Sequence, residues 1–339
     1  MSGIRQLRQI QLGRETTAGT ATTATTRWRG LGAFEDNREV TFPEEFIGVI
    51  GGGDRSYIAK VEGTLTMDDT DATFEQLPHL FIAGIAATTT GVQDGTGSGY
   101  IYTYNIAHST APVIQTYTIR AGDNQQAEIM EYAFVRSFSI KGNAGEAVMM
   151  SAEWTGRQVT TSTFSSNITV PEVETILASR GSLSLDAVTD TYGMASFDDS
   201  LIAFEVNVSD TMMPKYAFSP GGNSSNPPFF SFVYAGNREI TGSLTFEHNA
   251  NGVAEKEAFR NQTPRLLRLW FFGSDLTTAG SYSEKQFKID LPIKYESFDA
   301  LDDVDGNSII KANFVSRYNA TVGNAGKFEL ILDNTTSIP

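Results

Sequence analysis

The sequence contains no cysteine, only three histidines and no long apolar run. Without cysteine the chain can have no disulfide, no thiolate nucleophile and no cysteine-rich zinc site. No segment approaches the roughly 20 consecutive apolar residues that a transmembrane helix needs, and the N-terminal stretch lacks the apolar core of a signal peptide. We therefore expect a soluble protein that is made in a cytoplasm.

The motifs that usually carry catalysis are also missing. His79, His108 and His248 show neither the His-x-x-Glu-His nor the His-x-x-x-His spacing, so a zinc hydrolase site is poorly supplied. GTGSGY at 95–100 only resembles a Gly-x-Ser-x-Gly elbow, because no helical pattern follows it. The glycines at 51–53 are not followed by Gly-Lys-Ser/Thr, which favours a flexible hairpin tip over a phosphate loop.

The acidic run DALDDVDGNSII at 299–310 is the strongest metal candidate. When Gly306 takes position 6 of an EF-hand loop, Leu301 and Ala312 fall at positions 1 and 12, where carboxylates are required. The register therefore fails. Asp-Gly-Asn between two strand patterns is typical of a hairpin turn instead.

Adjacent carboxylates occur elsewhere, for example Asp68/Asp69 and Asp198/Asp199. On a strand, neighbouring side chains point to opposite faces, so these pairs could not act together. We predict no catalytic residue, no cofactor and no metal site, and hence no enzyme. A hydrolase that uses scattered Asp and Glu stays open as an alternative, and its sign would be a deep pocket with carboxylates of strongly shifted pKa.

The charge balance bears on possible partners. The net charge is −15 with a pI near 4.6, so the field of the whole chain repels phosphate polyanions. Arg265, Arg268 and Trp270 cluster with other apolar residues in PRLLRLWFFG. This segment is too apolar for a nucleic-acid platform, which favours a core or interface strand from which two arginines point outward.

Alternating apolar and polar residues between Trp28 and Trp154 indicate strands that are buried on one face. AEIMEYAFVRSFSIKG (127–142) and EAVMMSAEWTGRQV (146–159) are joined by a turn signal and predict a hairpin. Residues 1–30 are basic and then Thr/Ala-rich, which suggests an extended N-terminal arm. The polar stretch 161–170 suggests a linker, and proline followed by glycine at the two ends of 171–181 indicates a helix.

The second half of the chain repeats the pattern of the first. Phe34 in AFEDN matches Phe204 in AFEVN at an offset of 170, and GTLT at 63–66 matches GSLT at 242–245 at an offset of 179. The hairpin from Ser137 to Arg157 matches 297–317 without gaps at an offset of 160. Because order and pattern agree, we predict a tandem duplication. The predicted units are residues 31–160 and 171–339.

Four segments carry a resemblance to a known family. They are QLGRETTAGTATTATTRWRG (11–30), AFEDN (33–37), EGTLTMDD (62–69) and PEVETILASRGSLSLDAVTDTYG (171–193). Together they resemble the tail tube proteins, or major tail proteins, of long-tailed bacteriophages, in a form with two tandem tube domains. The resemblance covers nearly the whole chain.

The resemblance implies a mainly β fold with two β-sandwich or barrel domains, each with a short flanking helix, here Phe74 to Ile85 and Val253 to Gln262. It implies a trimeric ring with pseudo-sixfold symmetry, and rings that stack into the hollow tail tube of the virion. The implied partners are further copies of the chain, the tape-measure protein and the tail terminator and tip proteins. Genomic DNA would pass through the acidic lumen without specific binding, and no membrane would be involved.

Within that family, the long segments rich in Gly and Pro are expected to contact neighbouring subunits or rings. A β-rich surface adhesin or carbohydrate-binding module is the alternative, although the sequence shows no export signal. The expected contact segments are the arm (Arg5 to Thr26) and the loops 43–58 and 219–230. The expected barrel strands, with Asp and Glu alternating toward the lumen, are 128–140, 146–157, 287–298 and 308–318.

Overall fold

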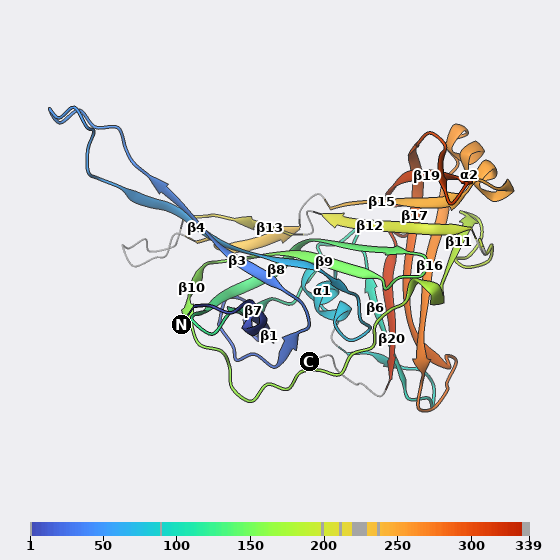
Figure 1. The fold of residues 1–339 in the computed structure, drawn as a ribbon, viewed down its shortest axis with the longest axis horizontal. Helices are drawn as coiled ribbons and strands as arrows, with labels where there is room; N and C mark the ends of the chain where they lie inside the picture. Colours follow the sequence, from blue (N-terminus) through green and yellow to red (C-terminus); the bar gives the residue numbers. More distant parts are fainter. Residues whose placement is uncertain are drawn as a thin grey trace.

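A computed structural model describes residues 2–88, 90–197, 200–209, 212–218, 229–235 and 238–333. Strands dominate these ranges, which hold two α-helices and two 3-10 turns, η1 (Arg5–Leu7) and η2 (Ala178–Arg180). The mainly β class expected from the alternating pattern is therefore confirmed. Figure 1 shows a body of packed strands from which one long hairpin projects.

The largest feature is a curved antiparallel sheet, here the front sheet, which runs through both halves of the chain. Its strands lie side by side in an order that differs from their order in the sequence. That order is β3 (Gly32–Thr41), β4 (Tyr57–Asp71), β9 (Met149–Gly156), β8 (Ala127–Asn143), β12 (Leu201–Ser209), β15 (Glu239–Glu247), β19 (Asn307–Ser316) and β17 (Glu284–Phe298).

Two groups of strands pack behind the front sheet. The first group is β2 (Thr26–Trp28), β1 (Gln9–Arg14), β7 (Tyr117–Gly122), the start of β8, and β10 (Val159–Ser162). The second group is β11 (Gly181–Ala187), β16 (Arg265–Asp275), the start of β17, β20 (Lys327–Asp333), β6 (Gly99–Asn105) and β5 (Val92–Gln93). Since β6 precedes β7 in the chain but pairs with β20, the two halves are interlaced.

Three short strands complete the fold. β18 (Asp302–Val304) forms a tight hairpin with β19 through Asp305 and Gly306. Both turn residues have positive φ, 53° and 85°, as a two-residue type I′ turn requires. The predicted Asp-Gly turn is thus confirmed. β13 (Met212–Lys215) and β14 (Phe232–Ala235) form a separate pair.

Strand periodicity explains why the front sheet buries one face. In β4, Val61, Leu65 and Met67 are buried, whereas Thr64 and Thr66 point to the other side. This alternation is the period of a pleated strand, whose successive side chains leave on opposite faces. The predicted 127–142/146–159 hairpin is present as β8 and β9, paired in antiparallel register.

Both helices lie close to their predicted positions. The helix expected over 74–85 is α1 (Leu77–Gly84), and it is buried along its whole length. The helix expected over 253–262 is α2 (Ala250–Arg260), which begins earlier because the side chain of Asn249 accepts hydrogen bonds from two backbone N–H groups of the first turn. Neither helix is long and apolar enough to cross a membrane.

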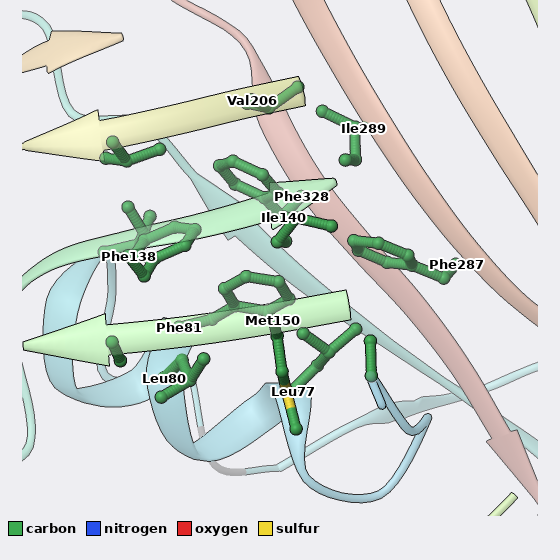
Figure 2. Packing of buried hydrophobic residues seen from close by; sticks show 14 of the residues in the cluster. Leu77, Leu80, Phe81, Phe138, Ile140, Met150, Val206, Phe287, Ile289 and Phe328 are labelled. Carbon is green, nitrogen blue, oxygen red and sulfur yellow. The ribbon is translucent and has the colours of Figure 1, made fainter. Parts of the chain in front are cut away.

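Phe81 of α1 lies at the centre of the main core. Its ring centroid is 5.3 Å from that of Tyr104, 5.7 Å from Phe138, 5.9 Å from Phe287 and 4.9 Å from Phe328. Figure 2 shows Phe81 with Phe138, Phe287 and Phe328, between strands that come from both halves of the chain. One helix of the first half therefore holds the second half through a shared apolar core.

The expectation of an extended arm over residues 1–30 is wrong for β1 and β2, which are packed into the fold. β1 pairs with β2 on one side and β7 on the other, and Ile10 and Leu12 are buried. The apolar alternation in QIQLGR marks this strand, whereas the Thr/Ala-rich composition reflects only the following loop. Residues 9–14 of the predicted arm thus form a strand with a neighbour on each side in their own chain.

The prediction of a helix over 171–181 is also wrong. Thr175 and Leu177 form isolated bridges with Thr73 and Ala147, and only the single 3-10 turn η2 is helical. The backbone N–H of Ile176 donates to the carbonyl of Ala72 at 2.8 Å, and the carbonyl of Ile176 accepts from Val148 at 2.8 Å. Because these backbone groups are bonded to distant parts of the chain, they cannot form the ladder of a helix.

Candidate assembly surface

The strand order of the front sheet repeats. Strands β3-β4-β9-β8 of the first half are followed by β12-β15-β19-β17 of the second half. In the first pair of each set the registers coincide: Phe34 lies opposite Leu65, and Phe204 lies opposite Leu244. These are the pairings that the two sequence offsets, 170 and 179, relate to each other.

The second pair of each set agrees in finer detail. Phe138 lies opposite Ala152, and Phe298 lies opposite Ala312. The β8–β9 register shifts between Val135 and Ser137, and the β17–β19 register shifts at the corresponding place, between residues 295 and 297. The two irregularities are related by the same offset of 160 as the rest of the hairpin. This is a specific similarity, because a β-bulge changes the direction of a strand at a defined position.

The two sets differ in the register between their second and third strands, which is β4–β9 in the first set and β15–β19 in the second. Leu65 of β4 lies opposite Trp154 of β9, whereas Leu244 of β15 lies opposite Ala312 of β19. Ala312 corresponds to Ala152, so the register of β15 against β19 is shifted by two residues relative to that of β4 against β9. A slip of two residues leaves every side chain on its original face, so the buried face of the sheet survives.

The two sets join at a seam between β8 and β12. Gly142 lies opposite Phe204, Ser139 opposite Asn207, and residue 138 opposite residue 208. Lys141 lies at the same seam opposite Glu205, and its ammonium also donates to Asp69 at 2.7 Å. The last strand of one set therefore pairs directly with the first strand of the next.

Each end of the front sheet has an open edge. Among the described residues, β3 pairs only with β4. At the other end, β16 begins opposite Ile293, so among the described residues the stretch of β17 from Lys294 to Phe298 pairs with β19 alone. An open edge presents unpaired backbone N–H and C=O groups, which can pair with a strand of another chain. At the seam, Asn207 lies opposite Ser139. The sequence offsets of 170 and 160 relate these two residues to Asn37 on β3 and to Asp299, just after β17.

The long hairpin in Figure 1 is formed by β3, β4 and the residues between them. Its tip, here the arm tip, is residues 42–56. It carries apolar side chains that no described residue covers: Phe42 is 74 % exposed, Phe46 95 % and Val49 58 %. The glycines at 51–53 lie in this tip, as the hairpin interpretation of that sequence expects.

A second, shorter arm is formed by β13 and β14. The hydroxyl of Tyr216 donates to the carbonyl of Val61 at 3.3 Å, so this arm lies against the base of the first. Residues 219–228 of the predicted contact loop 219–230 are outside the described residues. Phe230 is fully buried against Tyr132, with ring centroids 5.1 Å apart, so this end of the loop contacts its own chain.

A cavity of about 490 Å³, here the seam cavity, lies where the two sets join. Phe204 and Phe271 line it and are buried, whereas Phe197 and Leu201 are only partly buried. A smaller cavity of about 240 Å³ takes the corresponding place in the first half and is lined by Gly32, Ala33 and Phe34 at the start of β3.

The outer face of the front sheet is polar. Ser151 and Glu153 of β9 alternate with buried apolar residues, and Glu205 and Asn207 do the same in β12. Each of these two strands thus places one carboxylate on the polar face. Whether this face lines a lumen stays a prediction.

The three histidines do not come together. His79 is buried in α1 with Nδ1 3.1 Å from the hydroxyl of Tyr117, and burial, followed by the charge of Arg14, lowers the pKa of its imidazole to about 4. His108 stacks on Tyr318 with ring centroids 4.9 Å apart. No group of three potential metal ligands occurs within the described ranges. Of the adjacent carboxylates, Asp69 pairs with Lys141, and Asp198/Asp199 are outside the described residues.

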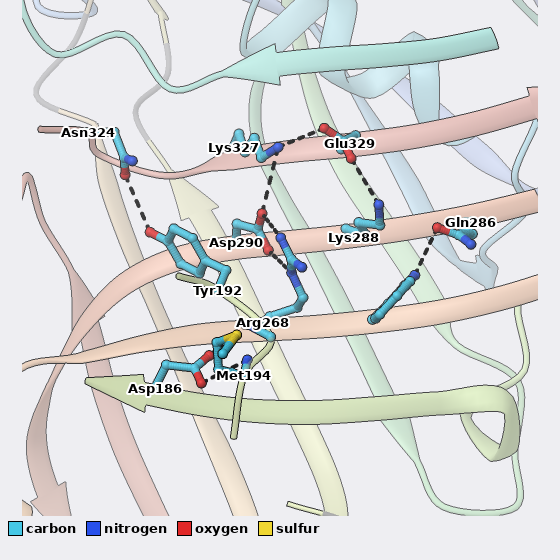
Figure 3. A network of polar contacts seen from close by, with 12 residues as sticks. Asp186, Tyr192, Met194, Arg268, Gln286, Lys288, Asp290, Asn324, Lys327 and Glu329 are labelled. Atoms are coloured by element: carbon cyan, nitrogen blue, oxygen red, sulfur yellow. Dashed lines mark hydrogen bonds and ion pairs between the residues drawn. The ribbon is translucent and has the colours of Figure 1, made fainter. Parts of the chain in front are cut away.

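A buried polar network covers the second back group, as Figure 3 shows. Arg268 holds Asp290 through two bonds of 2.7 and 2.8 Å, and Lys327 lies 3.8 Å from the same carboxylate. Burial opposes ionisation of Glu329, but Lys327 and Lys288 outweigh it and hold the pKa of Glu329 below its usual value. The outward-pointing arginine expected in PRLLRLWFFG is thus engaged in an ion pair.

Among the buried carboxylates that the sequence-based reasoning did not single out, Glu15 and Asp186 each bind a loop. Glu15 accepts hydrogen bonds from the backbone of Gly19 and Tyr132 and from two threonine hydroxyls. Asp186 accepts from three successive backbone N–H groups, at 193–195. Each carboxylate ties the loop that follows its strand back onto the sheet. Neither lies in a recognisable motif, so no local signal in the sequence marks them.

No protein-family model matches this chain, and no curated protein sequence matches it either.

Proposed function

We propose that this chain is a tail tube protein of a long-tailed bacteriophage, a structural virion protein and not an enzyme. Three copies would close into a ring with pseudo-sixfold symmetry, and rings would stack into the hollow tube. The observation that carries this proposal is the repeated strand order, with matching registers inside each pair of strands and one open edge at each end of the front sheet.

Closure follows from the seam that the chain already contains. β12 takes its place on β8 inside one copy. Because β3 corresponds to β12 and β17 corresponds to β8, β3 of a second copy would lie beside residues 298–303, where β17 ends and the chain turns into β18. A repeated pairing of this kind ends without a free edge when it closes on itself.

The polar face of the front sheet would then line the channel. Its carboxylates, together with the net charge of −15, would repel the phosphates of the genome, so DNA would slide past the wall. A tape-measure protein would fill the channel before ejection, and tail terminator and tip proteins would cap the ends. The domain division at 31–160 and 171–339 is part of the same proposal.

Cysteine cross-linking tests the ring, because the natural chain contains no cysteine. We expect the double variant Asn37→Cys/Asp299→Cys, when assembled and oxidised, to give a ladder of covalent species that ends at three chains. Opposed residues of neighbouring strands are close enough for a disulfide.

Matched variants make the test specific. Ser139→Cys/Asn207→Cys should close within one chain, because these residues are opposed at the existing seam. Asn37→Cys/Ala300→Cys is displaced by one residue, puts the two thiols on opposite faces and should not cross-link. Assemblies that electron microscopy shows to be rings but that leave the Asn37/Asp299 pair unlinked would contradict the register. A chain that stays monomeric at high concentration would contradict the ring itself.

The contact between copies should also depend on salt. Inside the chain, Lys141 faces Glu205 across the seam, but the corresponding residue on the open edge is Leu301, and Glu35 would face it. Acidic residues would then meet with no lysine between them, so we expect assembly to rise from low salt to about 0.5 M as screening increases. Leu301→Lys should restore assembly at low salt and Leu301→Glu should weaken it, as light scattering would show.

A further inference from the structure

The arm tip and the seam cavity lie at opposite ends of the molecule. β3 starts beside the smaller cavity and runs toward the arm tip, and the antiparallel seam sets β12 in the same direction in the second half. β12 starts at Leu201, which lines the seam cavity. In Figure 1 the arm tip and the start of β12 accordingly lie far apart along the longest axis.

The arm tip exposes apolar side chains of the kind that are usually buried. Phe46, Ile47 and Ile50 are more than half exposed, and Ile50 is fully exposed. An apolar patch of this kind on a soluble surface marks an interaction site. The tip is also acidic, because Glu44, Glu45 and Asp54 outnumber its single cation, Arg55, which pairs with Glu45 at 3.0 Å.

The seam cavity offers the complementary surface. Its lining includes the apolar side chains of Leu183, Leu269 and Phe271, together with Ala178 and Ser179 of η2. Arg180, at the end of the same turn, is exposed and has no carboxylate partner in the part of the chain that the structure describes. A dry cavity of about 150 Å³ is enough for a benzene ring, so 490 Å³ has room for an aromatic side chain.

We propose that the arm tip of one copy docks into the seam cavity of a second copy in the next ring, with Phe46 and Ile50 as the anchors. Within the described residues, each copy has one such tip and one cavity of this size at the seam, so the numbers match. The acidic tip would approach Arg180 at the rim, which favours this orientation. A contact between different surfaces at opposite ends does not close on itself and continues from copy to copy.

This inference rests on the proposed tube, and it assigns the stacking contact to one cavity. Two single-cysteine chains of different size test it, one with Ile50→Cys and the other with Ser179→Cys. After co-assembly and oxidation we expect a covalent heterodimer of the two. The matched control replaces Ser179→Cys by Val253→Cys, which is exposed on α2 at the same end of the molecule but outside the cavity.

A second measurement uses Phe46→Asp/Ile50→Asp, which should leave single rings intact but abolish their stacking in electron micrographs. Stacked tubes in which Ile50→Cys links equally well to Val253→Cys, or not at all to Ser179→Cys, would overturn the docking site and leave the ring proposal standing. Normal stacking by the double aspartate variant would do the same. A natural chain that forms no ring under any condition would overturn both.

Discussion

Replacement of Phe81 by alanine should lower the free energy of unfolding by about 3–5 kcal/mol. Phe81 has no exposed surface and its ring meets four other aromatic rings, from β6, β8, β17 and β20. Alanine would lose the transfer free energy of the ring and leave a cavity that the surrounding sheets cannot close. Urea unfolding followed by circular dichroism measures the change.

The same substitution at Phe46 is the matched control. Phe46 is 95 % exposed at the arm tip, so Phe46→Ala should change the stability of the monomer by less than about 0.5 kcal/mol. If Phe81→Ala proved equally mild, α1 would not be the element that holds the two halves together. If Phe81→Ala unfolded only one half, observed as two separate transitions, the shared core would be less cooperative than Figure 2 indicates.

The contrast between these two phenylalanines also shows what the sequence can predict. The spacing of apolar residues predicted α1, and turn residues between alternating strands predicted the β8–β9 hairpin and the Asp305-Gly306 turn. Each of these features depends on neighbours within a few residues. The likeness of the two halves predicted which strands correspond. It could not predict that β6 crosses to β20, since that pairing joins residues more than 200 positions apart.

The prediction for the N-terminal segment was wrong for a related physical reason. Composition is averaged over a window, and the Thr/Ala-rich loop at 16–25 outweighed the short alternation of β1. Glu15 follows β1 directly and is 2 % exposed, yet as an isolated glutamate it looks like any surface residue in the sequence. Its partners, such as Thr118 and Tyr132, come from strands a hundred residues away, so only the fold brings them together.

The open edges of the front sheet required both kinds of information. The sequence offsets relate β3 to β12 and β8 to β17, but they say nothing about which strand neighbours which. The register at the seam supplies that geometry, and the offsets then carry it to the pair Asn37 and Asp299. A contact between copies is thus inferred from a contact within one copy.

Asp290→Asn should destabilise the chain by about 3–5 kcal/mol, because it leaves buried cations without their carboxylate. Asp290 has no exposed surface, Arg268 grips both of its oxygens, and Lys327 lies 3.8 Å away. Asparagine keeps the shape but presents N–H donors to the guanidinium on one side. Trp270 donates to Gln286 beside this network, so tryptophan fluorescence during urea unfolding should follow the change.

Two comparisons decide whether an uncompensated charge causes the loss. Asp69→Asn breaks an exposed pair with Lys141, whose side chain is 44 % exposed, and should cost no more than about 1 kcal/mol. Arg268→Met/Asp290→Asn removes the anion together with its main cation and should recover part of the stability lost in Asp290→Asn, since less buried charge is then left unpaired. If the double variant were less stable than the single one, the hydrogen bonds of Arg268 rather than its charge would hold β16 to β17. The network of Figure 3 would then act as a set of directional bonds.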